Sequence, residues 1–170
     1  MLFNLILIGI ILFLLFMLSM VWPPDSPWAP WWRTNKKTAK AICKIAKINS
    51  KDVIYDLGCG DGEALLQAAK FGASGIGIEI DPLRVLIANL RVIKNNFQNK
   101  ITIKKSNFFN EDLSKASVII VYLVPKTLEK LLPKFKKELK KGTRIISYKY
   151  EINLPLKSFD KQNQLRLYVI

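Results

Sequence analysis

Two kinds of hydrophobic pattern divide the chain. Leu2 to Val21 is an unbroken apolar stretch without a charged side chain, and its only polar residues are Asn4 and Ser19. About 20 residues, at about 1.5 Å each, span the roughly 30 Å of a hydrocarbon core, so this stretch predicts a transmembrane helix. Beyond it, shorter apolar runs alternate with polar segments. We therefore expect an anchor over residues 1–22, a linker over 23–33 and a folded domain over 34–170.

The sequence after the apolar stretch is typical of a membrane exit. It holds all four tryptophans and four of the eight prolines, and all four of these prolines lie in "WPPDSPWAP". Indole rings favour the headgroup layer, and prolines prevent a continuous helix. A cleaved signal peptide is the alternative, but it requires a basic start and a small-x-small exit, and this chain has neither. Basic residues follow the tryptophans, which predicts a cytoplasmic domain and an outer amino terminus; they are Arg33, Lys36, Lys37 and Lys40.

The second part of the chain alternates between strand and helix patterns. Helical spacing is expected over 34–48 and 63–70, after Asp81-Pro82, and after Pro125. Strands are expected over 52–57, 75–80, 101–105, 116–123 and 143–148, with one more in the terminal "LRLYVI". Such alternation predicts an α/β fold with a Rossmann-like, doubly wound, mostly parallel sheet.

Two helices carry more specific expectations. Asp81 is expected to cap its helix, with Pro82 at the first helical position. Apolar spacing predicts the buried face of that helix, formed by Leu83, Leu86, Ile87, Leu90 and Ile93. Pro133 is expected to kink or split the helix that begins at Pro125.

Composition limits the chemistry available. The net charge of +14 suits an anionic membrane surface, although compositional drift explains a lysine excess equally well, and we expect no nucleic-acid partner. The sequence contains no histidine, which removes the usual general base and the usual zinc ligand. Cys43 and Cys59 have neither the number nor the spacing of a disulfide framework or a metal site.

The stretch "VIYDLGCGDG" predicts a ligand-binding turn after a strand. Gly58, Gly60 and Gly62 would let a dinucleotide, a nucleoside triphosphate or a sulfonium cofactor approach the backbone. Glu79 follows about twenty residues later, where an acid holds ribose hydroxyls. Asp56 and Asp61 would repel a pyrophosphate but attract a cation, and the Walker lysine pattern is absent. We therefore expect S-adenosyl-L-methionine as the cofactor.

With these motifs, the chain resembles class I S-adenosylmethionine-dependent methyltransferases. "YDLGCGDG" is similar to their first motif and "GIEIDP" to their acidic second motif. The anchor, "SPWAPWW" and "VYLVP" narrow the resemblance to a membrane-anchored group, typified by the mitochondrial enzymes that methylate lysine in the c-subunit of ATP synthase and in the adenine nucleotide translocator. That group often has Pro-x-Val-Pro-Thr where this chain has "PWAPWW", and the C-terminal part looks short for the full seven-stranded sheet.

The resemblance implies roles for individual residues. Tyr122 would be catalytic, at the position where such enzymes meet the acceptor nitrogen. The cofactor-binding residues would be Asp56, Gly58, Cys59, Gly60, Asp61, Gly62, Glu79, Ile80, Asn107 and Phe108. No metal site is expected.

The implied function is membrane-anchored methylation of a lysine in a membrane protein. The partners would be the lipid bilayer and a membrane-protein substrate with an accessible lysine. Three alternatives stay open from the sequence: a methyltransferase for a quinone or lipid, a non-catalytic cofactor-binding membrane protein, and a dinucleotide-dependent oxidoreductase.

Overall fold

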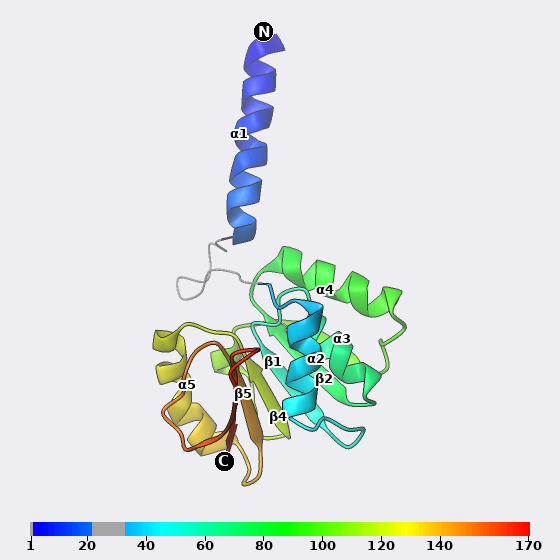
Figure 1. Ribbon diagram of the computed structural model, residues 1–170. Coiled ribbons are helices and arrows are strands. Elements are labelled where there is room, and N and C mark those ends of the chain that lie inside the picture. Colours follow the sequence, from blue (N-terminus) through cyan, green and yellow to red (C-terminus); the bar gives the residue numbers. More distant parts are fainter. Residues whose placement is uncertain (1, 22–32) are drawn as a thin grey trace.

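The computed structural model describes residues 2–21 and 33–170, with side chains in the first range for residues 4–17 (Figure 1). The four tryptophans and all of the expected linker except Arg33 lie outside these residues. The first helix, α1, spans Leu2–Val21, and its described apolar side chains are all exposed. Within the part of the chain that the structure describes, no helix has the length and apolarity needed to cross a membrane. The transmembrane helix predicted over 1–22 is therefore not shown.

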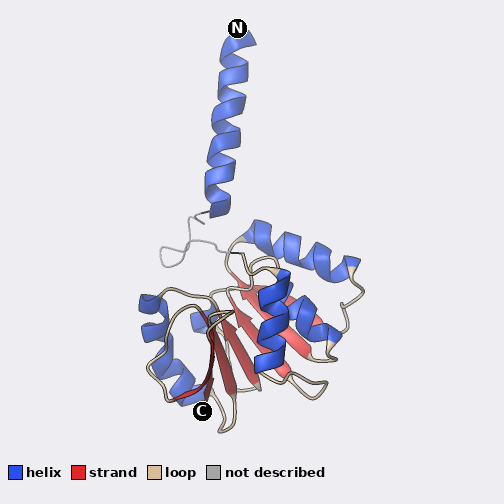
Figure 2. Cartoon of the chain, viewed as in Figure 1, coloured by secondary structure: helices blue, strands red, loops and turns tan. Residues whose placement is uncertain are grey.

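The folded domain is built on one seven-stranded sheet with the order β3-β2-β1-β4-β5-β7-β6 (Figure 2). The first five of these strands run parallel, while β7 is antiparallel to both β5 and β6. This arrangement confirms the expected Rossmann-like, mostly parallel fold. The strands are β1 Val53–Leu57, β2 Ser74–Glu79, β3 Ile101–Lys105, β4 Val118–Val121, β5 Arg144–Tyr148, β6 Leu156–Asp160 and β7 Leu165–Val169.

Helices cover both faces of the sheet, so both sides of the central parallel strands β1 and β4 are buried, whereas the edge strand β3 is largely exposed. One apolar cluster joins the sheet to α2, α3 and α4, and the second joins its other face to α5 and to a short 3-10 helix, η1. The fully buried β4 confirms that a strand without alternation is covered on both faces. The helices are α2 Lys36–Ile45, α3 Glu63–Lys70, α4 Pro82–Lys94, α5 Pro125–Glu138 and η1 Phe108–Asn110.

The predicted buried face of α4 is wrong, although its predicted start is confirmed. Asp81 caps α4 by accepting a hydrogen bond from the Arg84 backbone N–H at 2.9 Å. The residues that turn inward are Arg84, Ala88 and Val92, while Leu86, Leu90 and Ile93 are exposed. Ala88 packs against the glycine turn, since a Cβ added at Gly62 would lie 3.6 Å from Ala88 Cβ, in ordinary van der Waals contact. The side of α4 that meets the turn thus carries Arg84, Ala88 and Val92, and the larger apolar side chains lie on its other sides.

Two further expectations are corrected in the second half of the domain. Pro133 does not split α5, which continues from Pro125 to Glu138, while the kink stays a prediction. The C-terminal part is long enough for seven strands, since β6 and β7 form an antiparallel hairpin and β7 pairs with β5. Strand β6 escaped prediction because every one of its residues except Asp160 is exposed, which leaves no alternation between buried and exposed positions.

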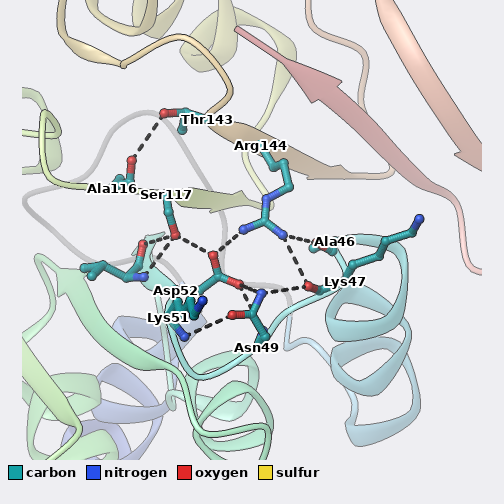
Figure 3. Close-up of polar contacts among 10 residues, drawn as sticks. Ala46, Lys47, Asn49, Lys51, Asp52, Ala116, Ser117, Thr143 and Arg144 are labelled. Carbon is teal, nitrogen blue, oxygen red and sulfur yellow. Dashed lines mark hydrogen bonds and ion pairs between the residues drawn. The ribbon is translucent and has the colours of Figure 1, made fainter.

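A polar cluster closes the amino end of β1 (Figure 3). Asp52, which directly precedes β1, accepts hydrogen bonds from Ser117 Oγ at 2.8 Å and from the Asn49 backbone and side-chain nitrogens at 2.9 and 3.0 Å. It also forms an ion pair with Arg144, whose guanidinium donates to the Ala46 and Lys47 carbonyl oxygens. These contacts tie the end of α2 and strands β1, β4 and β5 together.

Candidate functional site

The glycine turn follows β1 at the carboxyl edge of the parallel strands. Gly58, Gly60 and Gly62 have φ angles of 79°, 54° and 76°, in the left-handed region that side chains disfavour. The Gly58 backbone N–H donates to the Ile78 carbonyl oxygen at 2.8 Å, which holds the turn against β2. Gly58 is exposed, so this part of the backbone is open to a ligand. The geometry is therefore that of the ligand-binding turn expected from the sequence.

Glu79, the last residue of β2, fixes the shape of this turn. Its Oε2 accepts a hydrogen bond from the Gly60 backbone N–H at 2.9 Å, and its Oε1 accepts from Ile80 and Asp81 at 2.9 and 3.0 Å. A carboxylate has about four acceptor positions, so one is left for a hydroxyl group of a ligand. Glu79 thus supports the turn and keeps one acceptor position, and the adjacent Ile80 is half-buried.

Asp56 lies within β1, two residues before the turn, and is 6% exposed. Among the described residues, no group donates a hydrogen bond to its carboxylate. Burial, followed by the nearby carboxylates of Glu79 and Asp61, raises the pKa of Asp56 to about 7. The ionised form is therefore costly in the free protein and would be stabilised by a cation.

Asp61 is surrounded differently from what the sequence predicts. Its carboxylate forms ion pairs with Arg33 at 2.8 Å and with Arg91 of α4 at 2.7 Å. Arg91 also donates to the Asp61 carbonyl oxygen at 2.7 Å and pairs with Glu63. The two guanidinium groups neutralise Asp61, so its repulsion of a pyrophosphate is weaker than the sequence argument requires. Among the described residues, the carboxylates of Asp56 and Glu79 have no ion pair, and only that of Glu79 accepts hydrogen bonds from backbone N–H groups.

Arg33 and Arg91 were missed by the sequence analysis as parts of the site. Arg33 was read only as part of the basic segment after the linker, and Arg91 lies 30 residues after Asp61. No spacing rule links these positions, because the contact depends on how α4 crosses the glycine turn. Through Arg33, the first described residue of the domain is bound directly to that turn.

Asn107 and Phe108 lie beyond β3, in the loop that enters η1. The Asn107 side-chain oxygen accepts a hydrogen bond from the Phe109 backbone N–H at 3.0 Å, and Asn107 is exposed. That contact occupies one lone pair of the oxygen, so a second lone pair and the amide nitrogen remain free for an adenine amino group or ring nitrogen. Phe108 packs against Phe109 with ring centroids 4.9 Å apart, which forms an apolar surface beside Asn107.

Tyr122 directly follows β4, at the same edge of the sheet as the glycine turn. A side chain added at Gly58 would meet Leu123 at 3.4 Å, which places the segment after β4 beside that turn. Burial, and then Tyr148 and Tyr150, raise the pKa of Tyr122 above its ordinary value. Its hydroxyl is therefore neutral at physiological pH and can both donate and accept a hydrogen bond.

The two cysteines are free and buried. Burial raises the pKa of the Cys43 thiol to about 12, and burial together with the carboxylate of Asp56 raises that of Cys59 well above its ordinary value. A thiol that stays protonated is a poor nucleophile. The Cys59 sulfur lies against Gly77, where an added side chain would approach it to 2.7 Å. The Cys59 side chain thus packs inside the domain, and its backbone N–H donates to the Ile78 carbonyl oxygen at 3.2 Å.

A groove of about 480 Å³ lies elsewhere on the domain. It is lined by Lys37, Lys40, Ala41, Lys44, Ile45, Asp160 and Asn163. None of these residues belongs to the glycine turn or to the ends of β1, β2 or β4, so the groove is separate from the candidate cofactor site. Among the described residues, no cluster of three or more acidic, cysteine or histidine side chains could hold a metal ion.

The residues at the sheet edge fit S-adenosyl-L-methionine better than a phosphorylated nucleoside. Asp56 is a buried carboxylate with no donor among the described residues, beside a second buried carboxylate, Glu79. A sulfonium or ammonium group would relieve the cost of ionising Asp56, whereas a diphosphate would increase it. The exposed backbone at Gly58 and the remaining acceptor position of Glu79 complete a site for a cationic nucleoside.

Comparison with known proteins agrees with this chemistry. A sequence model described as the ANTKMT methyltransferase domain matches residues 56–155, which include the glycine turn and Tyr122. A protein-lysine N-methyltransferase of Saccharolobus islandicus (strain REY15A) is 39% identical over 135 residues, which cover 78% of this chain and 82% of that protein. An ATP synthase C-subunit lysine N-methyltransferase of Caenorhabditis elegans is 24% identical over 118 residues, or 69% of this chain and 62% of that protein.

A solved structure shares the whole domain architecture. It is an RNA methyltransferase from Salinibacter ruber in complex with S-adenosyl-L-homocysteine, with a TM-score of 0.79 and 29% sequence identity. The match covers 82% of this chain and 94% of that one. The similar proteins thus share a fold and methyl transfer, while their names differ in the acceptor.

Proposed function

We infer that this chain, which belongs to the ANTKMT methyltransferase domain family and is an S-adenosylmethionine-dependent methyltransferase, transfers methyl groups to lysine side chains of a protein. The observation that carries the proposal is the row of groups along the carboxyl edge of the sheet. Glu79, Asp56 and Tyr122 follow one another on the adjacent strands β2, β1 and β4. The 39% identity to a protein-lysine N-methyltransferase supports lysine as the acceptor.

The first part of the mechanism is to hold the cofactor in one orientation. When bound, S-adenosyl-L-methionine supplies an already activated methyl group on a sulfonium, so positioning provides most of the catalysis. The carboxylate of Asp56 would bind the cationic methionine part, and that of Glu79 a ribose hydroxyl. The glycine turn allows close backbone approach, and Asn107 with Phe108 would lie against the adenine. The contact between Arg33 and Asp61 holds the turn in its binding geometry.

The second part is to present a neutral amine to the methyl group. A lysine side chain attacks only after it has lost a proton, and a partly dehydrated site lowers its pKa. The sequence offers no histidine as a base, and in this proposal the proton passes to water before the attack. The neutral hydroxyl of Tyr122 can accept a hydrogen bond from an N–H of the amine, which directs the nitrogen lone pair toward the methyl carbon.

We also propose that residues 1–22 attach the enzyme to a membrane, with the domain on the cytoplasmic side, and that the acceptor is a membrane protein. Support comes from the uncharged 20-residue α1, whose described apolar side chains are exposed. The exposed face of α4 adds to it: Leu86, Leu90 and Ile93 are each more than half exposed. Arg33 and Arg91 of α4 bind the same Asp61, so the chain enters the domain beside this apolar face.

A labelling experiment tests the proposed function. The full chain, reconstituted in lipid vesicles, is incubated with methyl-labelled cofactor and with membranes of the cells that produce it. We expect label in a protein band, and methylated lysine after acid hydrolysis of that band. Tyr122→Phe should slow the transfer at least tenfold while leaving cofactor binding within about threefold, since the hydroxyl acts on the acceptor.

Other outcomes identify the alternatives. Label in the lipid extract would favour a quinone or lipid acceptor, and label in an RNA fraction would favour the acceptor named for the Salinibacter protein. Cofactor binding without transfer to any fraction would favour a non-catalytic membrane protein. Full activity of a chain beginning at residue 33 on membrane substrates would contradict the role of the anchor.

A further inference from the structure

Three tyrosines form a cluster at the edge of the sheet, next to the candidate site. Val121 pairs with Ser147 across β4 and β5, so Tyr122 and Tyr148, the next residues along, lie side by side. Their ring centroids are 4.3 Å apart with the planes tilted by 47°. Tyr150 is farther from Tyr122, with ring centroids 6.4 Å apart and planes at 30°. Each of the three is half-buried.

A tight turn at Lys149 brings Tyr148 and Tyr150 to the same side. Lys149 has a φ of 71°, which is rare for a residue with a side chain, and the Tyr150 N–H donates back to the Tyr148 carbonyl oxygen at 2.9 Å. Ser147 Oγ donates to the Tyr150 carbonyl oxygen at 2.6 Å, and Arg166 donates to that of Lys149 at 2.8 Å. Backbone strain of this kind concentrates at functional sites and persists only where the surroundings enforce it.

The rings of Tyr122, Tyr148 and Tyr150 are less buried than the ring of a core tyrosine, and one of them already contacts an ammonium group. Tyr168, a core tyrosine, is 2% exposed and its hydroxyl accepts a hydrogen bond from the Ile152 N–H. The rings of the cluster are instead partly open at the edge of the sheet. The ammonium group of Lys149 lies 5.5 Å from the centroid of the Tyr150 ring, within the range of a cation–π contact. The Tyr150 ring thus already accepts an ammonium group, and an acceptor ammonium would take the place of Lys149 there or bind the other ring faces of the cluster.

We propose that Tyr122, Tyr148 and Tyr150 form a binding site for the ammonium group of the acceptor lysine and its methylated forms, and that this site determines how many methyl groups are added. The proposal rests on the proposed function, because it requires a lysine acceptor beside Tyr122. Aromatic faces bind quaternary and methylated ammonium groups through the ring quadrupole, and they do not need an N–H donor on the ligand. They can therefore hold the side chain after each methyl group has replaced a hydrogen.

Each cycle balances as one substitution. The amine lone pair forms the N–C bond, the C–S bond breaks, and its electron pair stays on the sulfur of S-adenosyl-L-homocysteine. The product is a methylated ammonium ion, which must lose a proton to water before it can attack a second cofactor molecule. Retention on the aromatic faces during cofactor exchange favours a second and third transfer over release of the monomethylated product.

The test measures the methylation state of the product. The full chain and its variants act on the labelled protein fraction, and mass spectrometry of the hydrolysate gives mono-, di- and trimethyllysine. Tyr150→Leu should lower the ratio of di- and trimethyllysine to monomethyllysine at least threefold. Tyr150→Phe keeps the ring and should stay within about twofold of the natural chain. Phe159→Leu, which removes the ring that lies 4.4 Å from the Arg166 guanidinium on the β6–β7 hairpin, is the matched control.

Two results would overturn the inference: an unchanged ratio in Tyr150→Leu, or the same loss in Tyr150→Phe, which would assign the effect to the hydroxyl. The absence of any methyllysine with the natural chain would instead contradict the proposed function. If Tyr150→Leu does not fold, Tyr148→Leu replaces it. In addition, tetramethylammonium chloride should inhibit the natural chain more strongly than sodium chloride at equal ionic strength, and equal inhibition by both salts would count against the site.

Discussion

Asp52 and Asp56 lie at opposite ends of β1, and the structure surrounds them in opposite ways. Asp52 is 5% exposed and is paired with Arg144, Ser117 and Asn49 (Figure 3). Asp56 is 6% exposed and has no hydrogen-bond donor among the described residues. The two carboxylates are equally buried, so their difference comes from their partners.

The polar groups at the amino end of β1 stabilise the fold, whereas the surroundings of Asp56 at its carboxyl end suit a ligand. At the amino edge of the sheet the polar groups satisfy one another, and the cluster holds the end of α2 to the sheet. At the carboxyl edge Asp56 is left with the repulsion of Glu79 and Asp61, which adds to burial in raising its pKa to about 7. A buried ionisable group with this kind of perturbation is a mark of a ligand site in parallel α/β folds. Four substitutions or conditions test the comparison.

The largest effect is expected at the amino end. Asp52→Ala leaves Arg144 and Asn49 without their buried acceptor, and we expect a loss of about 3 kcal/mol in the free energy of unfolding. Chemical denaturation with a circular dichroism signal measures it. Glu151→Ala, which removes a 78% exposed partner of Arg166, is the control and should cost less than about 1 kcal/mol. Equal costs for the two variants would show that the cluster is not a structural centre.

At the carboxyl end of β1, Asp56→Asn should have the opposite pattern: stability is kept, while cofactor affinity falls. It removes a charge that burial disfavours, so the free energy of unfolding should stay equal or rise at pH 8. Affinity for S-adenosyl-L-methionine should fall about 10–100-fold, equivalent to about 1.4–2.7 kcal/mol, because the cation loses its counter-charge. Calorimetry with S-adenosyl-L-homocysteine, which lacks the sulfonium charge, should show a smaller loss. Equal losses for both ligands would argue against a role of Asp56 at the sulfonium.

The pH dependence gives a third, smaller effect. Burial raises the pKa of Asp56 to about 7, so the carboxyl is mostly protonated at pH 6 and mostly ionised at pH 8. Because a cation binds the ionised form, affinity for S-adenosyl-L-methionine should rise by up to about tenfold between these pH values. In the free protein, ionisation of this group costs stability as the pH rises from about 4 to about 7. In Asp56→Asn, both the cofactor affinity and the stability should vary less with pH. If either still varies as in the natural chain, the titrating group is not Asp56.

The smallest effect concerns the ion pair between Arg33 and Asp61. Arg33 is 60% exposed and Arg91 also neutralises Asp61, so Arg33→Ala should change stability by less than about 1 kcal/mol. Affinity for S-adenosyl-L-methionine should fall two- to threefold as the glycine turn loosens. The control is Lys104→Ala on β3, which removes a comparable exposed ion pair with Glu111. It should leave the affinity for S-adenosyl-L-methionine unchanged. A loss of more than tenfold in Arg33→Ala would mean that Arg33 touches the ligand itself.

The sequence by itself determined the elements whose signals are local. The glycine turn, the Asp81 cap with Pro82, and the parallel order of strand and helix were predicted because each depends on neighbouring residues or on a short period. The position of Asp56, Glu79 and Tyr122 at strand ends followed from the same pattern. Shared edges of parallel strands then brought these three residues together.

Only the tertiary structure decided which groups meet across the fold. It placed Ala88 of α4 against Gly62 and left Leu86, Leu90 and Ile93 exposed, and it neutralised Asp61 with Arg33 and Arg91. It also added Tyr148 and Tyr150 to Tyr122 through the register of β4 and β5 and the turn at Lys149. Such contacts join residues far apart in the chain, so no local period encodes them, and they fix both the charge and the shape of the site.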